Sequence, residues 1–423
     1  MDDINKHMET RVYYGEYTLR HWINLLLTRS IVLPEYQRSF VWSEMDIKQL
    51  FQSLEVGQFI PPITIAHYND GTDSQNLILD GQQRLTSILL AYLGYMPIKE
   101  MFCAQEGELA SGDDSNEEVI DTSMEWTYKY LLDGSQKKNT LPLILSRLSS
   151  DEKYKKLELE FHNNKEEFYD NTFLGFSFII PNSIDAKESQ RYFSTLFRNM
   201  NYLGSKLSSL ESRRSLYYMN ADYKDYLDGK SEKGEDVLCG IQIMENMQPR
   251  KIDFVRYLAI LSQYVGTQNI YKVLLGYSAY KSRESYYADY VAYIVGLKQE
   301  AREDKFDNFK IETILPNGCW KAQFIQVRAF LERNKKRINL DEKTKAFTSW
   351  IDADYWLFGL LYWVLFNRKY IVDEDALLND VGNEIADKRT PKEGNDYSRN
   401  PNRLGNLRER IQRSIELYKL HVQ

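Results

Sequence analysis

The segment LILDGQQRLTSILLAYLG at 77–94 constrains the fold of this chain most, because a strand pattern and a helix pattern meet there across one glycine. The apolar run NLILD at 76–80 predicts a short buried strand. Apolar residues at helical spacing follow Gly81 and predict a helix with one face in a core: Leu85, Ile88, Leu89 and Leu93. A strand that leads directly into a helix is typical of a domain in which helices pack on a small sheet.

Other segments of the first half carry the same two kinds of pattern. Residues 17–30 predict a helix with one apolar face, formed by Leu19, Trp22, Ile23, Leu26 and Leu27. Ser43 and Asp46 predict the capped start of a second helix. The runs at 61–68 and 173–181 predict strands. The first half is therefore expected to be an α+β domain.

The second half shows helical periodicity in most of its long apolar segments, at 251–265, 319–337, 349–370 and 407–422. A chain of 423 residues is too long for one ordinary core. We expect an α+β domain at 1–220 and a mostly α-helical domain at 221–423. An acidic stretch at about 103–125 is expected to be an insertion in the first domain.

The composition indicates a globular protein of a reducing compartment. The three cysteines lie far apart, which argues against a disulfide framework and against a cysteine-based zinc site. The apolar run at 355–366 is too short to span a bilayer, and the N-terminus lacks the apolar core of a signal peptide. We therefore expect a cytoplasmic protein without a membrane partner and without a dedicated metal site.

The residues of the strand-to-helix turn are unusual for a helix start. Asp80 is expected to be the N-cap, and Gln83 three residues later completes a variant of the capping box. That interpretation does not explain Gly81 and Arg84, since glycine weakens a helix and a cation opposes the dipole at a helix N-terminus. Both residues suit an anion at this helix end, held by free N–H groups and a guanidinium. The capping and the anion interpretations both stay open.

Four segments, in this order, resemble the N-terminal domain of GmrSD-type restriction proteins, of the ParB/sulfiredoxin-like superfamily. They are LPEYQRSFVW at 33–42, GQFIPPITIA at 57–66, the segment at 77–94, and LFRNMNYLGSKLSSLESRRSLYYM at 196–219. The resemblance covers residues 15–220, and its paired motifs are more specific than a single glycine-rich turn. The fold class that it implies is α+β, with a ParB/sulfiredoxin-like N-terminal domain and a small mixed sheet.

The resemblance implies that a nucleoside triphosphate with Mg²⁺ binds at the turn before the helix. The residues expected to bind this cofactor are Gln37, Arg38, Gly81 and Gln82. The residues expected to act in catalysis are Asp80, Gln83 and Arg84. Taken alone, an arginine close to an aromatic residue, as Arg38 is to Tyr36, more commonly forms a surface cation–π pair than a ligand site. Gln82 stands where sulfiredoxins have their reactive cysteine, so thiol chemistry is excluded.

The segment at 201–211 allows a structural and a functional interpretation. Ser208 and Glu211 predict a capping box for another helix. For Asn201 and Lys206 two interpretations stay open, a structural role and a contact with the nucleotide or with DNA.

Relatives of this kind hydrolyse nucleoside triphosphates and restrict modified phage DNA, so the resemblance implies DNA as a partner. An HNH-type nuclease needs histidines that the five histidines of this chain do not provide in one place, so a separate polypeptide is expected to cut. Because the net charge is −7, a contact with DNA would have to use local basic runs, and these lie at 321–340 and 388–413. The commoner role of such runs is a solvated helix face.

Three functions therefore compete. The first is a nucleotide hydrolase of an anti-phage restriction system, in which a carboxylate such as Asp80 or Glu35 activates water. Its weakness is that no second catalytic acid lies beside the motif. The second is a non-catalytic module that senses nucleotide or DNA and regulates a separate nuclease. The third is a DNA nickase that uses the same site.

Overall fold

The computed structural model describes residues 10–34, 39–69, 74–102, 126–132, 139–161, 164–181, 192–193, 195–196, 209–218, 220–245, 248–273, 283–297, 306, 309, 311–315, 318–338, 346–390 and 403–423. The chain forms two compact units, Met1–Gln105 with Ile120–Ser215, and Glu106–Val119 with Leu216–Gln423. We call them the N-terminal and the C-terminal unit. The acidic stretch expected at 103–125 lies outside the described residues, as do Asn201, Lys206 and Ser208.

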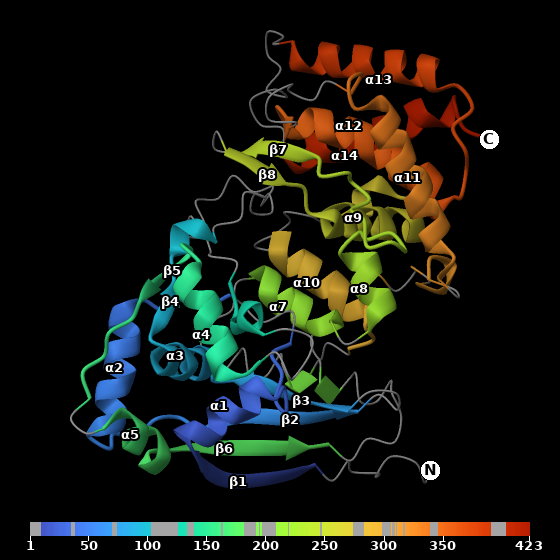
Figure 1. Ribbon diagram of the computed structural model, residues 1–423. Helices are drawn as coiled ribbons and strands as arrows, with labels where there is room; N and C mark the ends of the chain where they lie inside the picture. The colour runs from blue at the N-terminus through green and yellow to red at the C-terminus, as the bar shows by residue number, and fades with distance from the viewer. Residues whose placement is uncertain are drawn as a thin grey trace, which may run out of the picture. The chain divides into compact units, whose positions relative to one another are not determined.

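The N-terminal unit is built on a four-stranded sheet with strand order β1-β6-β2-β3 (Figure 1). Its strands are β1 (Arg11–Thr18), β2 (Ile63–Asn69), β3 (Ser74–Asp80) and β6 (Phe173–Ile180). Strand β6 pairs antiparallel with β1 and parallel with β2, and β2 pairs antiparallel with β3. A separate pair of strands consists of β4 (Tyr95–Pro97) and β5 (Tyr154–Lys156). The small mixed sheet expected for this half is therefore present.

Of the helices of this unit, those at 19–27, 44–55 and 82–93 lie at the predicted positions, whereas those at 141–150 and 165–171 were not predicted individually. The helices are α1 (Leu19–Leu27), α2 (Glu44–Glu55), α3 (Gln82–Leu93), α4 (Leu141–Ser150) and α5 (Lys165–Asn171), with α7 (Ser209–Tyr217) at the division between the units. All five predicted apolar residues of α1 are buried. The predicted capping box of α2 is confirmed, because Ser43 and Asp46 each bond the other's backbone N–H. Local patterns were sufficient to find α1, α2 and α3.

Strand β1 was not predicted, because its residues show no alternation between buried and exposed positions. Residues 11–16 are exposed, and β1 lies at the edge of the sheet. Its pairing with β6 joins segments about 160 residues apart, from Arg11 with Ile180 to Thr18 with Phe173. Gly15 lies opposite Phe176, whose ring would be 2.8 Å from any β-carbon at that position. The strand is thus defined by a partner that is remote in the sequence.

The C-terminal unit is mostly helical, as expected. Its helices are α8 (Ala221–Leu227), α9 (Phe254–Thr267), α10 (Arg283–Ile294), α11 (Trp320–Asn334), α12 (Trp350–Leu360), α13 (Glu374–Arg389) and α14 (Leu404–Lys419). A π-helical turn, Leu361–Phe366, continues α12. A small sheet of β7 (Gln242–Glu245), β8 (Gln248–Lys251) and β9 (Ala346–Phe347) was not predicted. Among the described helices, none is long and apolar enough to cross a membrane.

Helices α12 and α14 approach each other closely at Gly359. A β-carbon there would lie 2.2 Å from the ring of Tyr418, so only glycine permits this contact. The N–H of Gly359 donates to the Ser414 hydroxyl at 2.7 Å, and the Tyr418 hydroxyl donates to the carbonyl of Trp356 at 2.7 Å. The apolar run at 355–366 is therefore the buried centre of this unit.

Candidate functional site

The turn between β3 and α3 is made by Gly81 rather than by a capping side chain. Asp80 is the last residue of β3, and Gly81 is the N-cap of α3 with φ of +92° and no side-chain capping bond. The prediction that Asp80 caps the helix is therefore wrong. Glycine is required here, because φ is positive and a β-carbon would lie 2.3 Å from Cδ1 of Ile63. The turn thus explains Gly81 without any ligand.

Gln83 ties the N-terminus of α3 to the loop that precedes α2. Its Oε1 accepts a hydrogen bond from the N–H of Val41 at 3.0 Å, and its Nε2 donates to the carbonyl of Ser39 at 3.0 Å. Between these two residues, Phe40 is fully buried and its N–H donates to the carbonyl of Trp126. The predicted capping-box role of Gln83 is therefore replaced by a contact across more than 40 residues of sequence.

Arg84 folds back over the turn instead of extending into solvent. Its Nη2 donates to Oδ2 of Asp80 at 2.6 Å, and its Nη1 donates to the carbonyl of Pro61 and, at 3.5 Å, to that of Pro62. The Arg84 side chain is 12% exposed, whereas that of Asp80 is 50% exposed. Burial lowers the pKa of Arg84, against the opposing influence of Asp80. The positive charge near the helix N-terminus is thus balanced within the turn.

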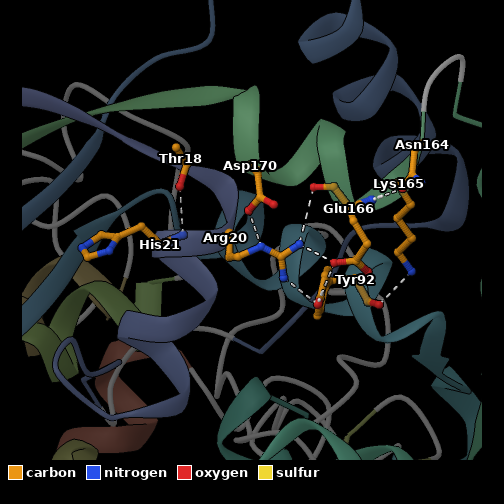
Figure 2. A network of polar contacts seen from close by, with 8 residues as sticks. All are labelled: Thr18, Arg20, His21, Tyr92, Asn164, Lys165, Glu166 and Asp170. Atoms are coloured by element: carbon orange, nitrogen blue, oxygen red, sulfur yellow. Dashed lines mark hydrogen bonds and ion pairs between the residues drawn. The ribbon is translucent and has the colours of Figure 1, made fainter.

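The C-terminal end of α3 is held by a polar network between three helices (Figure 2). Arg20 of α1 donates to the Tyr92 hydroxyl at 2.8 Å and forms ion pairs with Glu166 and Asp170 of α5. Although burial opposes the charge, these two carboxylates raise the pKa of Arg20. Lys165 donates to the carbonyl of Tyr92 at 2.8 Å. With Gln83 at its other end, α3 is fixed at both ends, so the turn rests on a rigid element.

The structure brings together the predicted residues of the turn, from Asp80 to Arg84. Gln82 and Gln83 are buried, and Asp80 is the exposed member. Gln37 and Arg38 lie outside the described residues, so their role at the site stays a prediction. Their sequence neighbour Ser39 is held at the turn by Gln83.

Sequence reasoning missed two groups that complete the turn, the carbonyls of Ser39 and Pro61. Both accept hydrogen bonds from predicted site residues, Gln83 and Arg84 respectively. Their segments, 33–42 and 57–66, were already singled out, but only as parts of the resemblance. A main-chain acceptor leaves no signature in the amino-acid type, so only the structure could identify these groups.

The turn suits an anion better than a metal held by protein ligands alone. No group of three or more His, Cys, Asp or Glu side chains in the described part of the chain could hold a metal ion. Asp80 would therefore contribute at most one carboxylate to a Mg²⁺ that is held mainly by phosphates. At Gly81 the space that a β-carbon would occupy is filled by Cδ1 of Ile63, at 2.3 Å, and Nη2 of Arg84 lies 3.4 Å away. The features of the turn that suit a phosphate are therefore the helix N-terminus and the guanidinium of Arg84.

Several basic residues in the described parts of the two runs considered for DNA are paired with acidic residues. In the first, Lys321, Arg328, Arg333, Lys335 and Arg337 form ion pairs with Asp222, Glu235, Glu374, Glu332 and Asp375, respectively. In the second, Lys388, Arg389, Arg410 and Arg413 form ion pairs with Glu409, Asp352, Asp354 and Glu384, respectively. A contact between either run and DNA stays a prediction, and the pairing lowers the positive potential available for it.

Comparison with known proteins identifies the part of the chain that holds the turn. Residues 22–218 match the family model of the GmrSD restriction endonuclease, N-terminal domain. An uncharacterized protein of Methanocaldococcus jannaschii is 30% identical over 182 residues, which cover 36% of this chain and 30% of that protein. The match thus spans less than a third of the relative's length. No solved structure matches the chain.

Proposed function

We propose that this chain is a restriction-system protein, as the match of residues 22–218 to the GmrSD N-terminal domain indicates, and that it hydrolyses a nucleoside triphosphate at the turn of residues 80–84. The observation that carries this proposal is the Asp80–Arg84 pair, whose carboxylate is half exposed, on a turn whose helix is fixed at both ends. A rigid helix N-terminus with an adjacent guanidinium is a ready site for phosphate oxygens.

In this proposal four residues of the turn have one task each. Gly81 forms the tight turn beside Ile63 from which the helix begins, and Arg84 donates to the phosphate oxygens. Gln83 holds the loop of residues 39–41 against the turn. Asp80, released from Arg84 when a phosphate takes its place, accepts a proton from the attacking water or would help to hold Mg²⁺ beside the phosphates. Mg²⁺, when bound, neutralises charge that develops on the phosphates.

The wider assignments are part of the same proposal. The small mixed sheet and the glycine turn support a ParB/sulfiredoxin-like fold for the N-terminal unit. The family name supports DNA as a partner. A separate HNH-type nuclease would make the cut, because the histidines of this chain are dispersed in the sequence.

One observation favours a second candidate function, a nucleotide-sensing module without turnover. The carboxylate of the turn, Asp80, is already engaged by Arg84 and is therefore not free to act as a base in this structure. A site with phosphate donors and no base available to activate water would bind a nucleotide without hydrolysing it.

The proposal is tested by measuring phosphate release by the purified full chain. The assay contains Mg²⁺ and one of the common nucleoside triphosphates, and it is run with and without DNA. Arg84→Ala is expected to lower turnover about 100-fold, because it removes a charged donor to the transition state. Arg147→Ala is the matched control, since Arg147 is an exposed arginine of α4 in the same unit. Turnover in Arg84→Ala within twofold of wild type would refute the site.

Nucleotide binding, measured separately on the same proteins, distinguishes the two candidate functions. A hydrolase is expected to release phosphate when DNA is present, and to lose this activity in Arg84→Ala. A sensing module is expected to bind nucleotide through Arg84 without releasing phosphate under either condition. Arg84→Lys adds detail, because it keeps the charge but loses the two-pronged contact of a guanidinium.

A further inference from the structure

The two faces of the four-stranded sheet in the N-terminal unit differ in character. One face contributes Ile63, Ile65, Ile78 and Leu174 to the buried core of this unit. Residues at alternate positions point to the opposite face. On that face four residues form a row across the strands, each opposite the next: Tyr14, Ser177, Thr64 and Asp80. The row therefore ends at the candidate site.

An irregularity in the sheet places Asp80 in this row. The register between β2 and β3 shifts between Thr64 and Ile65, so that Asp80 lies opposite Thr64 while Ile78 lies opposite Ile65. Without the shift, Asp80 and Ile78 would point to the same face, which is the core face. The shift thus turns the carboxylate of the turn onto the face opposite the core, where Asp80 is exposed although the nearby Ala66 and Leu77 of that face are buried.

The middle of the row consists of two hydroxyl groups. The Ser177 hydroxyl donates to Oγ1 of Thr64 at 3.1 Å, and both side chains are partly exposed. Each hydroxyl also has further capacity to donate or accept a hydrogen bond. The middle of the row is therefore polar and partly exposed, in contrast to the buried apolar pair Ala66 and Leu77 beside it on the same face.

Tyr14 stands at the other end of the row and is 78% exposed. It makes no hydrogen bond and no ring contact with any residue that the structure describes. Its neighbour Tyr13 lies opposite Phe178 on the core face and is 49% exposed. An exposed aromatic ring without a packing partner is available for stacking on a planar ligand.

We infer that this row is the nucleoside subsite of the triphosphate site, with the base stacked on Tyr14 and the sugar near Ser177 and Thr64. The inference rests on the proposed function of the turn. Neighbouring strands lie about 4.8 Å apart, so the row spans about 14 Å, comparable to an extended nucleoside triphosphate. Strand β1 precedes residues 22–218, so Tyr14 is a feature of this chain outside the matched family domain.

Binding of nucleoside triphosphates and of inorganic tripolyphosphate, which lacks a base, tests this subsite. In Tyr14→Ala, binding of the nucleotide is expected to weaken about tenfold while tripolyphosphate binds as to wild type, because only stacking is lost. Tyr14→Phe keeps the ring and is expected to bind like wild type. Tyr13→Ala is the matched control on the opposite face. Since Tyr14 is exposed, the thermal stability of the variants should match that of wild type.

The outcomes separate this inference from the proposed function. Nucleotide binding that depends on Arg84 but is unchanged in Tyr14→Ala overturns the subsite alone. Equal weakening of nucleotide and tripolyphosphate in Tyr14→Ala also overturns it, since the ring would then act on the phosphates. If Tyr14→Ala weakens the binding of single-stranded oligonucleotides only, Tyr14 contacts nucleic acid, and this result overturns the nucleoside subsite as well. A wild-type chain that binds neither probe overturns both proposals.

Discussion

The two units of this protein each contain a prominent arginine–aspartate pair, and the two pairs are built in opposite ways. In the N-terminal unit, Arg84 meets Asp80, whose side chain is 50% exposed. In the C-terminal unit, Asp354 is fully buried and is bonded by Arg256, Arg410 and the Tyr257 hydroxyl. The carboxylate of the first pair is in contact with solvent, whereas the second pair is surrounded by protein.

The buried cluster serves the architecture of the C-terminal unit. It joins α9, α12 and α14 through Arg256, Asp354 and Arg410, and the guanidinium of Arg256 lies 4.3 Å from the ring of Trp350. Burial alone would raise the pKa of Asp354, but Arg256 and Arg410 hold it below the usual value. An arginine–aspartate pair therefore indicates a ligand site only where solvent can reach it.

The largest expected effect is that of Asp354→Asn. Removing the carboxylate leaves two buried guanidinium groups without a counter-charge, so the C-terminal unit should lose about 3–5 kcal/mol of unfolding free energy. Hydrogen exchange of peptides from α9, α12 and α14 measures this loss for the unit by itself. Peptides of the N-terminal sheet in the same sample are the internal control. Unchanged protection in α12 would contradict the structural role of the cluster.

The same variant tests the pH dependence of the C-terminal unit. The pKa of Asp354 is lower in the folded than in the unfolded chain, so its contribution is complete above about pH 4 and is lost as pH falls through the folded pKa. Wild type should lose more stability between pH 5 and acid denaturation than Asp354→Asn, as measured by hydrogen exchange. Parallel pH profiles of the two proteins would be evidence against this linkage.

Gly81→Ala is expected to have the next largest effect, in the N-terminal unit. A left-handed conformation and a β-carbon 2.3 Å from Cδ1 of Ile63 should together cost about 1–3 kcal/mol. Gly57→Ala is the matched control, because Gly57 also has positive φ but nothing lies within 4 Å of its β-carbon position. Thermal unfolding of both variants measures the difference. Equal destabilisation would mean that the contact with Ile63 does not restrict this position.

Gln83→Glu is expected to loosen the loop of residues 39–41 with only a small effect on the rest of the unit. The carboxylate would face the carbonyl of Ser39, to which Nε2 of Gln83 now donates, at a cost of about 1–3 kcal/mol. Faster hydrogen exchange in peptides that contain Val41 and lower phosphate release are the measurements. If exchange rises and turnover does not change, the loop is not part of the active site.

The smallest effect is expected for Asp352→Asn, two residues before Asp354. Burial raises the pKa of Asp352 despite its ion pair with the partly exposed Arg389, so its charge contributes little to stability. The hydroxyls of Thr348 and Ser349, which now bond Asp352, can also bond an asparagine. Chemical denaturation should show a change below about 1 kcal/mol. A loss as large as that of Asp354→Asn would remove the distinction between the two aspartates.

Much of the fold of the N-terminal unit could be predicted from the sequence, since its helices carry local signals. The apolar spacing of α1 and the capping box of α2 are contained within a few residues. The candidate turn could be located for the same reason, because a strand, a glycine and a helix follow directly in the chain. The partners of the turn could not be predicted, since Gln83 bonds residues more than 40 positions away.

The amino-acid sequence by itself determined the periodic helices, the buried strands β2 and β3 and the position of the turn, because each depends on neighbouring residues. The tertiary structure decided that Asp80 is a counter-ion of Arg84 rather than a cap. It also decided that β1 is a strand, and that basic residues of the second half such as Arg333 and Arg413 are paired with acids of another helix. These properties depend on which remote segments meet, and that is settled only when the chain packs its core.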